Sequence, residues 1–119
     1  HQSSARYKKV QSEFTQLGLS EHYLGNIKAP FVKESRLKYG VTLKEIVPIS
    51  LNDTLFIIGQ ITHVVCDKDA IKEDGYIDIE ALETVTVSGL DSYHKSERLT
   101  RLSYAKPTNV ATGISLNGT

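Results

Sequence analysis

Apolar residues near the start of the chain recur with the period of an α-helix. They occupy positions i, i+3, i+7 and i+10 of one stripe: Tyr7, Val10, Phe14 and Leu17. Ser3 and Ser4 precede this stripe and Gly18 follows it, as expected for a capped start and a left-handed end. The pattern predicts a helix over residues 5–17, followed by a short second helical turn over 21–24.

The period then changes to two residues, which is typical of a β-strand with one face in water. Apolar side chains alternate with polar ones at Leu37, Tyr39, Val41 and Leu43. Thr54–Cys66 is instead apolar or β-branched at both alternating sets of positions, so we predict a central strand covered on both faces. Gly40 predicts a bulge or bend in the first strand, and Gly59 a break in the second.

Shorter segments complete the predicted domain. Asp67–Gly75 is charged and ends in an Asp-Gly turn, so Tyr76–Ile79 and Thr84–Ser88 are predicted as short strands after it. Lys95–Leu102 is predicted as a helical turn or two that stop before Pro107. The fold class predicted from these elements is α+β, mainly β, with an antiparallel barrel-like sheet and one packed N-terminal helix.

The composition excludes several classes of partner. Fourteen Lys and Arg balance fourteen Asp and Glu, so bulk charge attracts neither nucleic acid nor an anionic membrane surface. No apolar run approaches the roughly 20 residues that cross a bilayer, and no basic-then-apolar leader opens the chain. Cys66 is the single cysteine, which rules out an internal disulfide and suits a cytoplasmic location.

The chain contains no methionine and begins at His1, which is not a natural translation start. We therefore expect a processed chain or a fragment of a larger fold. A fragment would leave sheet edges open, and unpaired edges are prone to associate.

Familiar catalytic and metal sites are not supported by the residues. The segment from Asp67 begins like a calcium loop, but Ile71 replaces an oxygen ligand and Lys72 replaces the turn glycine. His63 and Cys66 are three residues apart, and on a strand this spacing sends their side chains to opposite faces, so no metal site is expected. Because a glycine-rich phosphate loop and a Gly-x-Ser-x-Gly elbow are also absent, no catalytic residue is predicted.

The densest polar segment is Ser88–Pro107, where basic, aromatic and hydroxyl side chains follow a predicted strand. As a loop, this segment would hold an anionic ligand through Arg and Lys while Tyr or His stacks on a ring. As a surface helix, it would carry its charges in water. The residues alone leave both interpretations open. A second polar run, Lys33–Arg36, is interpreted as a solvated strand edge.

Five stretches of the chain, taken in order, match a known family: SEFTQLGLS (12–20), APFVKESRLKYG (29–40), PISLNDTLFIIGQITHV (48–64), DGYIDIE (74–80) and SGLDSYHKSERLTRLSYAKP (88–107). Through them the chain resembles the C-terminal portion of the flavin reductase-like proteins, which have an FMN-binding split barrel, and specifically their flavoredoxin-type branch. The five stretches together cover nearly all of the chain up to Pro107.

The resemblance implies a fold, a cofactor and partners. The family forms a six-stranded antiparallel split barrel, usually as a homodimer with FMN near the subunit interface. NAD(P)H delivers hydride to the flavin, electrons pass to a free flavin or a redox acceptor protein, and the protein positions the cofactor. We therefore expect FMN as cofactor, NAD(P)H as co-substrate and a homodimer, with no nucleic acid and no membrane as partner.

The resemblance also implies which residues contact the cofactor. In this family the loop at Gly89 lies close to the flavin, so Gly89, Tyr93 and His94 are the first candidates to line it. Ser3 and Ser4 resemble a pair before the first helix, where hydroxyls and helix N–H groups can approach phosphate. Charge balance at the cofactor or interface is expected from three residues of the stretch RLSYAKP: Arg101, Tyr104 and Lys106.

The resemblance begins at the first helix, so the N-terminal strands of the family, which supply much of its flavin binding, have no counterpart here. We expect residues 1–107 to be the C-terminal part of a flavin reductase-like domain, 108–119 to be a mobile tail, and FMN to bind poorly or not at all.

The leading hypothesis is that this chain is part of an FMN-dependent NAD(P)H:flavin oxidoreductase and is inactive by itself. The alternatives are a flavoredoxin-type electron carrier that serves a protein partner, and a non-catalytic fragment that self-associates through open sheet edges.

Overall fold

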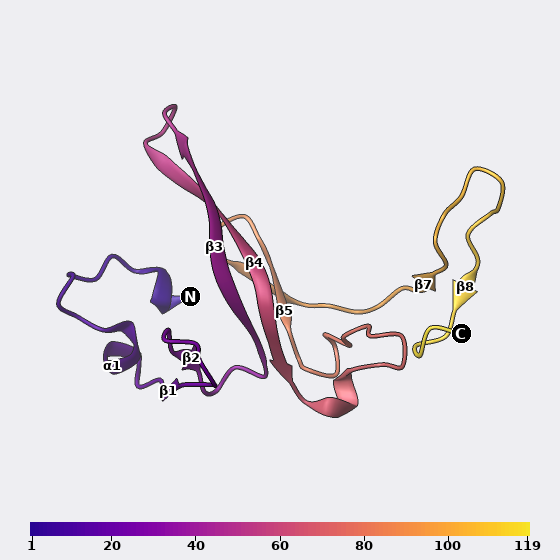
Figure 1. Cartoon of the computed structure of the whole chain (residues 1–119), viewed down its shortest axis with the longest axis horizontal. Coiled ribbons are helices and arrows are strands. Elements are labelled where there is room, and N and C mark those ends of the chain that lie inside the picture. The colour runs from indigo at the N-terminus through magenta and orange to yellow at the C-terminus, as the bar shows by residue number, and fades with distance from the viewer. The chain divides into compact units, whose positions relative to one another are not determined.

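The computed structural model describes all 119 residues, which form two compact units, His1–Val65 and Cys66–Thr119 (Figure 1). The chain is mainly β, with a single α-helix, and its strands pair antiparallel, which confirms the predicted class. The predicted barrel is not closed, because the strands form four separate two-stranded sheets. No helix is long and apolar enough to cross a membrane.

The first unit opens with a 3-10 turn, η1 (Gln2–Ser4), and the helix α1 (Glu13–Leu17). The predicted helix over 5–17 is therefore confirmed only in its last five residues, although Gly18 ends it in the left-handed region as expected, with φ of 66°. No residue of α1 is buried, and Val10, on the predicted apolar stripe, is 93% exposed. The other three stripe residues, Tyr7, Phe14 and Leu17, are only half-buried, and a stripe so partly covered does not stabilise a helix over the whole of 5–17.

A short hairpin occupies the region where a second helical turn was predicted, so that prediction is wrong. Strand β1 (Glu21–His22) pairs antiparallel with β2 (Phe31–Val32). Beyond the paired residues, the backbone N–H of Ser20 donates to both carboxylate oxygens of Glu34, at 3.0 and 3.2 Å. These hydrogen bonds with Ser20 lower the pKa of Glu34. Glu34 thus closes the hairpin, a role that the interpretation of 33–36 as a solvated edge did not include.

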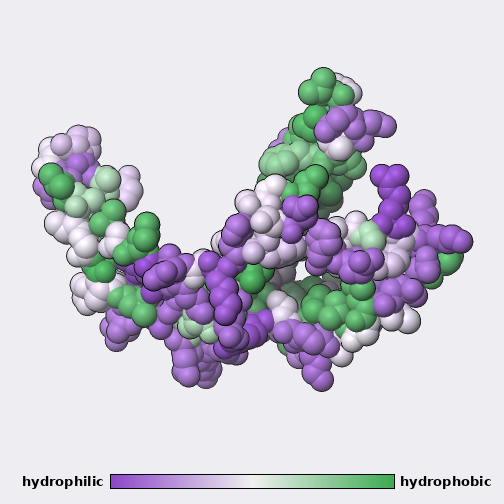
Figure 2. All heavy atoms as spheres, turned by 180° about the vertical axis from the view of Figure 1, so that it is seen from behind, coloured by the Kyte–Doolittle hydropathy of each residue, from purple (hydrophilic) through white to green (hydrophobic).

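Strands β3 (Leu37–Ile49) and β4 (Thr54–Cys66) form a long hairpin, which confirms both predicted strands and extends the first. β4 runs through Gly59 without the predicted break. Its predicted cover on both faces is also wrong for this chain, since Leu55 and Ile57 are 60% and 61% exposed and Phe56, between them, is 59% exposed. A two-stranded sheet offers no second layer, and Figure 2 shows apolar residues at the surface along this hairpin.

Gly40 lies at a point where the first unit is tightly packed. The residue is buried within β3, and a Cβ at this position would lie 2.6 Å from Ile27 Cδ1, 3.1 Å from His63 Cβ and 3.4 Å from Phe31 Cζ. Phe31 is itself one of the few buried apolar side chains. The glycine therefore permits a close approach of side chains to the β3 backbone.

The second unit contains a 3-10 turn, η2 (Lys68–Ala70), and two short hairpins. Strand β5 (Val85–Ser88) pairs with β6 (Ser92–Lys95), and β7 (Arg101–Leu102) with β8 (Gly113–Ile114). The strand predicted over 84–88 is confirmed, whereas 76–79 contributes only one bridge, Ile77 to Ile71. The helical turns predicted over 95–102 are wrong, because this segment carries strand residues at both ends and none in a helix. Mobility of 108–119 stays a prediction.

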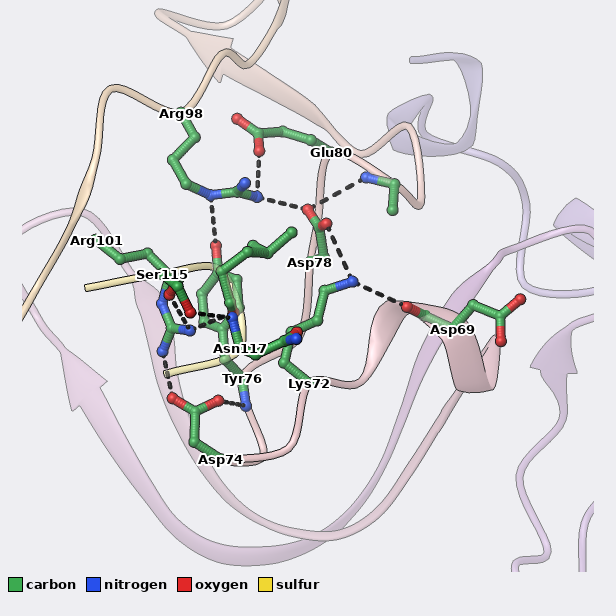
Figure 3. A network of polar contacts seen from close by, with 12 residues as sticks. Asp69, Lys72, Asp74, Tyr76, Asp78, Glu80, Arg98, Arg101, Ser115 and Asn117 are labelled. Atoms are coloured by element: carbon green, nitrogen blue, oxygen red, sulfur yellow. Dashed lines mark hydrogen bonds and ion pairs between the residues drawn. The ribbon is translucent and has the colours of Figure 1, made fainter. Parts of the chain in front are cut away.

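A buried carboxylate holds the second unit together. Only Ala70 and Leu82 form its buried apolar core, and beside them Asp78 is 6% exposed. The Asp78 carboxylate accepts a hydrogen bond from Arg98 at 2.5 Å and one from the Ala81 N–H at 3.4 Å (Figure 3). Lys72 Nζ lies 3.6 Å from the same carboxylate and forms a second ion pair with it. Arg98 also pairs with Glu80.

The electrostatics of Asp78 favour its charged form. Burial by itself raises the pKa of this carboxyl, but the hydrogen bonds from Arg98 and Ala81 and the nearby positive charges outweigh it, so the pKa is lowered. Arg98 in turn donates to the Tyr76 hydroxyl at 3.4 Å, and this bond, with the hydrogen bond to Asp78, raises the pKa of the guanidinium. Both shifts favour the charged forms, so the two side chains form an ion pair at neutral pH.

Gly40→Ala should lower the free energy of unfolding by about 1 kcal/mol, because the added methyl group must displace Ile27 and press against His63. Gly113→Ala is the control, since a Cβ there meets only Thr100 Oγ1, at 4.0 Å. Urea denaturation followed by circular dichroism measures both variants. Equal stabilities would show that the close approach does not require glycine at position 40.

Asp78→Asn should lower the free energy of unfolding by about 2 kcal/mol at neutral pH, because Arg98 and Lys72 lose a buried counter-charge. The folded-state pKa of Asp78 lies below the unfolded value of about 3.9, so its stabilisation is complete above that value and is lost as the pH falls through the folded pKa. The free energies of unfolding of the wild type and of Asp78→Asn should therefore become equal at acid pH.

Urea denaturation at a series of pH values measures this convergence. Asp69→Asn is the matched control, since the Asp69 side chain points away from the network in Figure 3 and only its backbone carbonyl accepts from Lys72. A stability difference between wild type and Asp78→Asn that stays constant down to acid pH would show that the charge of Asp78 does not stabilise the second unit.

Candidate functional site

The β5–β6 hairpin brings together three of the predicted cofactor-binding residues. Gly89 begins its turn with φ of 60°, a left-handed conformation that glycine adopts without strain. Tyr93 and His94 follow on β6, where they pair with Val87 and Thr86 of β5. The polar segment 88–107, for which both a loop and a surface helix were left open, therefore contains the returning strand of a hairpin and no helix.

The two faces of this hairpin differ in chemistry. Because side chains alternate along a strand, the paired residues divide into two sets. One face is polar and carries Thr86, Ser88, Ser92 and His94. The opposite face carries Val85, Val87, Tyr93 and Lys95. Tyr93 and His94 are neighbours in sequence but lie on opposite faces, so they cannot both contact the same side of one ligand.

A hydrogen bond orders the polar face. Ser88 Oγ lies 2.8 Å from His94 Nε2, across the diagonal between the Ser88–Ser92 and Thr86–His94 pairs, which are neighbours on this face. Both residues are exposed. A hydrogen bond that competes with water contributes only about 0.5–1 kcal/mol to stability, so its main effect is to fix the orientation of the imidazole.

Arg101 is held by several groups of the protein itself. Its guanidinium donates to Asp74 at 2.5 Å and to the backbone carbonyls of Ser115 and Leu116, and it lies 4.1 Å from the centre of the Tyr76 ring (Figure 3). The hydrogen bond from Arg101, together with the Tyr76 N–H, lowers the pKa of Asp74. Arg101 thus ties the Asp74 turn to the C-terminal segment, and its part in binding a cofactor stays a prediction.

Tyr104 and Lys106 lie together in the loop between β7 and β8. They line an open pocket of about 610 Å³ whose other lining residues are mostly hydroxyl or amide bearing: Ser103, Thr108, Asn109, Val110 and Thr112. Lys106 is the single charged residue of this lining, and Tyr104 is 85% exposed. One cation among uncharged donors matches a single anionic group such as a phosphate.

Ser3 and Ser4 lie in the first unit, in η1. The helix that was expected to follow them begins only at Glu13, and the Ser4 hydroxyl donates to the His1 carbonyl at 2.8 Å. The helix N–H groups that supported a phosphate site at the two serines are therefore not beside them. A phosphate contact by the serines themselves stays a prediction.

Ser88 and Ser92 belong to the polar segment noted in the sequence but were not among the predicted cofactor-binding residues, and Thr86, the third hydroxyl of the polar face, was missed altogether. The alternation of V-T-V-S with S-Y-H-K about a glycine was a usable signal for a hairpin with one polar face. The Asp78–Arg98 pair left no comparable signal. No group of three or more His, Cys, Asp or Glu side chains is arranged to hold a metal ion.

The chain is similar to solved structures. A "putative flavin reductase with split barrel domain" from Shewanella frigidimarina NCIMB 400 is 51% identical to it, with a TM-score of 0.82, over 88% of this chain and 53% of that chain. Flavoredoxin of Desulfovibrio vulgaris (Miyazaki F) is 24% identical, with a TM-score of 0.60, over 83% of this chain and 50% of that chain; this second likeness concerns the fold alone.

No protein-family model matches the chain, and neither does any curated protein. The chain spans about half the length of the two proteins whose structures it resembles. High identity with the first and a shared fold with the second support the resemblance seen in the five sequence stretches. The chain belongs to the flavin reductase-like split-barrel family.

Proposed function

We propose that this chain is part of an FMN-dependent NAD(P)H:flavin oxidoreductase. The observation that carries the proposal is the 51% identity with the Shewanella protein over 88% of this chain. At that identity the two folds coincide closely, and the polar residues of the second unit have the chemistry that a flavin nucleotide requires.

The donor set fits FMN, which combines an uncharged polar ring with a phosphate. Lys106 and the hydroxyl groups around it suit the phosphate, and the exposed Tyr104 ring offers a surface for stacking. The polar face of the β5–β6 hairpin, with Gly89 at its turn, offers uncharged hydrogen-bonding groups. The redox chemistry would be that of the flavin, and these residues would bind and orient it.

The proposal includes partners and a location. The protein would act in the cytoplasm as a homodimer and would pass electrons to a free flavin or to a redox acceptor protein. The exposed apolar side chains of the β3–β4 hairpin support association with a further polypeptide surface, because water contact at so many apolar residues is unfavourable. Because the chain spans half the length of its relatives, we propose that FMN binds weakly to these 119 residues alone.

The test compares the 119-residue chain with the full-length gene product, each incubated with FMN and freed of excess flavin. The full-length product should retain FMN, and the shorter chain much less. With added free FMN, the full-length product should oxidise NADH or NADPH continuously. A full-length product that stays colourless would contradict the proposal. One that retains FMN but oxidises NAD(P)H slowly without a protein acceptor would identify the flavoredoxin-type carrier instead.

Lys106→Gln should weaken binding of FMN to the full-length product about tenfold while leaving riboflavin affinity unchanged, because only FMN carries the phosphate. Flavin fluorescence measures both affinities. Lys44→Gln, at an exposed lysine of β3, is the matched control and should change neither. Equal loss of FMN and riboflavin affinity in Lys106→Gln would place the phosphate elsewhere.

A further inference from the structure

The loop between β7 and β8, residues 103–112, is closed by few contacts at its base. Each of the two strands contributes only two residues to the pairing. Beyond the strands, the Ser103 N–H donates to the Thr112 carbonyl at 2.9 Å, and the Thr112 N–H donates to Ser103 Oγ at 3.0 Å. A two-stranded hairpin is at best marginally stable in water. Closure of this loop therefore needs support from the rest of the second unit.

Arg101 supplies such support at the base of the loop. It is the first residue of β7, and its Nη1 donates to the carbonyls of Ser115 and Leu116, which directly follow β8. Its Nη2 donates to Asp74 at 2.5 Å, in a turn outside the loop (Figure 3). We call Arg101, Asp74 and the two carbonyls the latch. The latch connects both ends of the loop to one fixed point of the second unit.

Gly118 fits the C-terminal segment to the latch. Its φ is 97°, a conformation that side chains disfavour, and a Cβ at this position would collide with the Asp74 carboxyl group. The segment after β8 therefore packs against Asp74 by shape as well as by hydrogen bonds. A substitution at Gly118 can disturb the latch without changing the charge of the protein.

We propose that Arg101 is a positioning residue, which holds the loop 103–112 closed through the latch and so keeps the pocket at Lys106 in the form that binds an anionic group. This role differs from the charge balance at the cofactor that the resemblance implied. Arg101 is not among the residues that line the pocket, and its guanidinium is directed at Asp74 and the backbone. The inference rests on the proposed function only for the identity of the anion, which is the phosphate of FMN.

The first test measures hydrogen exchange of backbone amides by NMR in the full-length gene product without ligand. Arg101→Lys keeps the positive charge, but a single ammonium group cannot replace the fork of donors that reaches Asp74 and two carbonyls. The amides of Ser103 and Thr112 should exchange more than about tenfold faster in this variant. Amides of the β5–β6 hairpin should exchange at the wild-type rate. Unchanged exchange at Ser103 and Thr112, or equal acceleration in both hairpins, would overturn the proposal.

Gly118→Ala is a second variant that leaves every charge in place. It should accelerate exchange of the same two amides, because the added methyl group displaces Asp74 from the latch. Gly113→Ala is the matched control in the same segment, since a Cβ there meets only Thr100 Oγ1, at 4.0 Å, and exchange should not change. Wild-type exchange in Gly118→Ala would show that the latch does not depend on the packing of the C-terminal segment and would contradict the proposal.

The second test measures the affinity of the same proteins for FMN and for riboflavin by flavin fluorescence. Arg101→Lys and Gly118→Ala should each bind FMN about fivefold more weakly, as expected if the loop is closed in about one fifth of the molecules, and should bind riboflavin as the wild type does. A direct contribution of the Arg101 charge predicts instead that both variants keep their affinity for FMN. That result would overturn the positioning role.

Failure of the proposed function has a different signature. If the wild type binds neither flavin, the proposed function is wrong, and the assignment of FMN phosphate as the anion falls with it. The exchange rates of Ser103 and Thr112 are measured without flavin, so they decide in that case too whether the latch closes the loop. If the wild type binds FMN and only the variants fail to show the expected loss, the proposed function stands and the role of Arg101 is overturned.

Discussion

The second unit depends on one ion pair, between Asp78 and Arg98. Its apolar core is too small to fix the chain, since only Ala70 and Leu82 are buried beside the carboxylate. An unpaired buried carboxylate would be costly, so the segment that carries Arg98 has to return to it. Asp78 precedes β5 and Arg98 follows β6, and the pair therefore joins the two strands of the β5–β6 hairpin at their open end.

Tyr76 extends this constraint to the rest of the unit. Its hydroxyl accepts from Arg98, while its ring lies under the guanidinium of Arg101, which in turn reaches Asp74 and the backbone near Leu116 (Figure 3). The Tyr76 side chain thus links the Asp78–Arg98 pair, which secures the β5–β6 hairpin, to Arg101, the first residue of β7. The two ion-paired arginines anchor the segments that lead from the β5–β6 hairpin into β7.

Sequence pattern was informative where structure follows from neighbouring residues. The alternation over 37–43 and the β-branched run over 54–66 gave true strands. The apolar stripe over 5–17 predicted a longer helix than the five residues observed, because amphipathicity stabilises a helix only where another surface covers the stripe, and Val10 in its middle is exposed. Of the site, the polar residues could be named from the sequence, but the faces they occupy required the pairing register. The ion pairs of Asp78 and Asp74 join residues far apart in the chain, for which no local pattern exists.

The turn between β5 and β6 limits how this hairpin can vary in length. Side chains change face with every residue, so removing or adding one residue between Ser88 and Ser92 would rotate β6 by one position relative to β5. The imidazole would then emerge among the valines, and the tyrosine among the hydroxyls. Leu90 is almost fully exposed, so substitutions there would be tolerated far more readily than any change in loop length. The number of residues in this short turn therefore decides which side chains of β6 lie on each face of the hairpin.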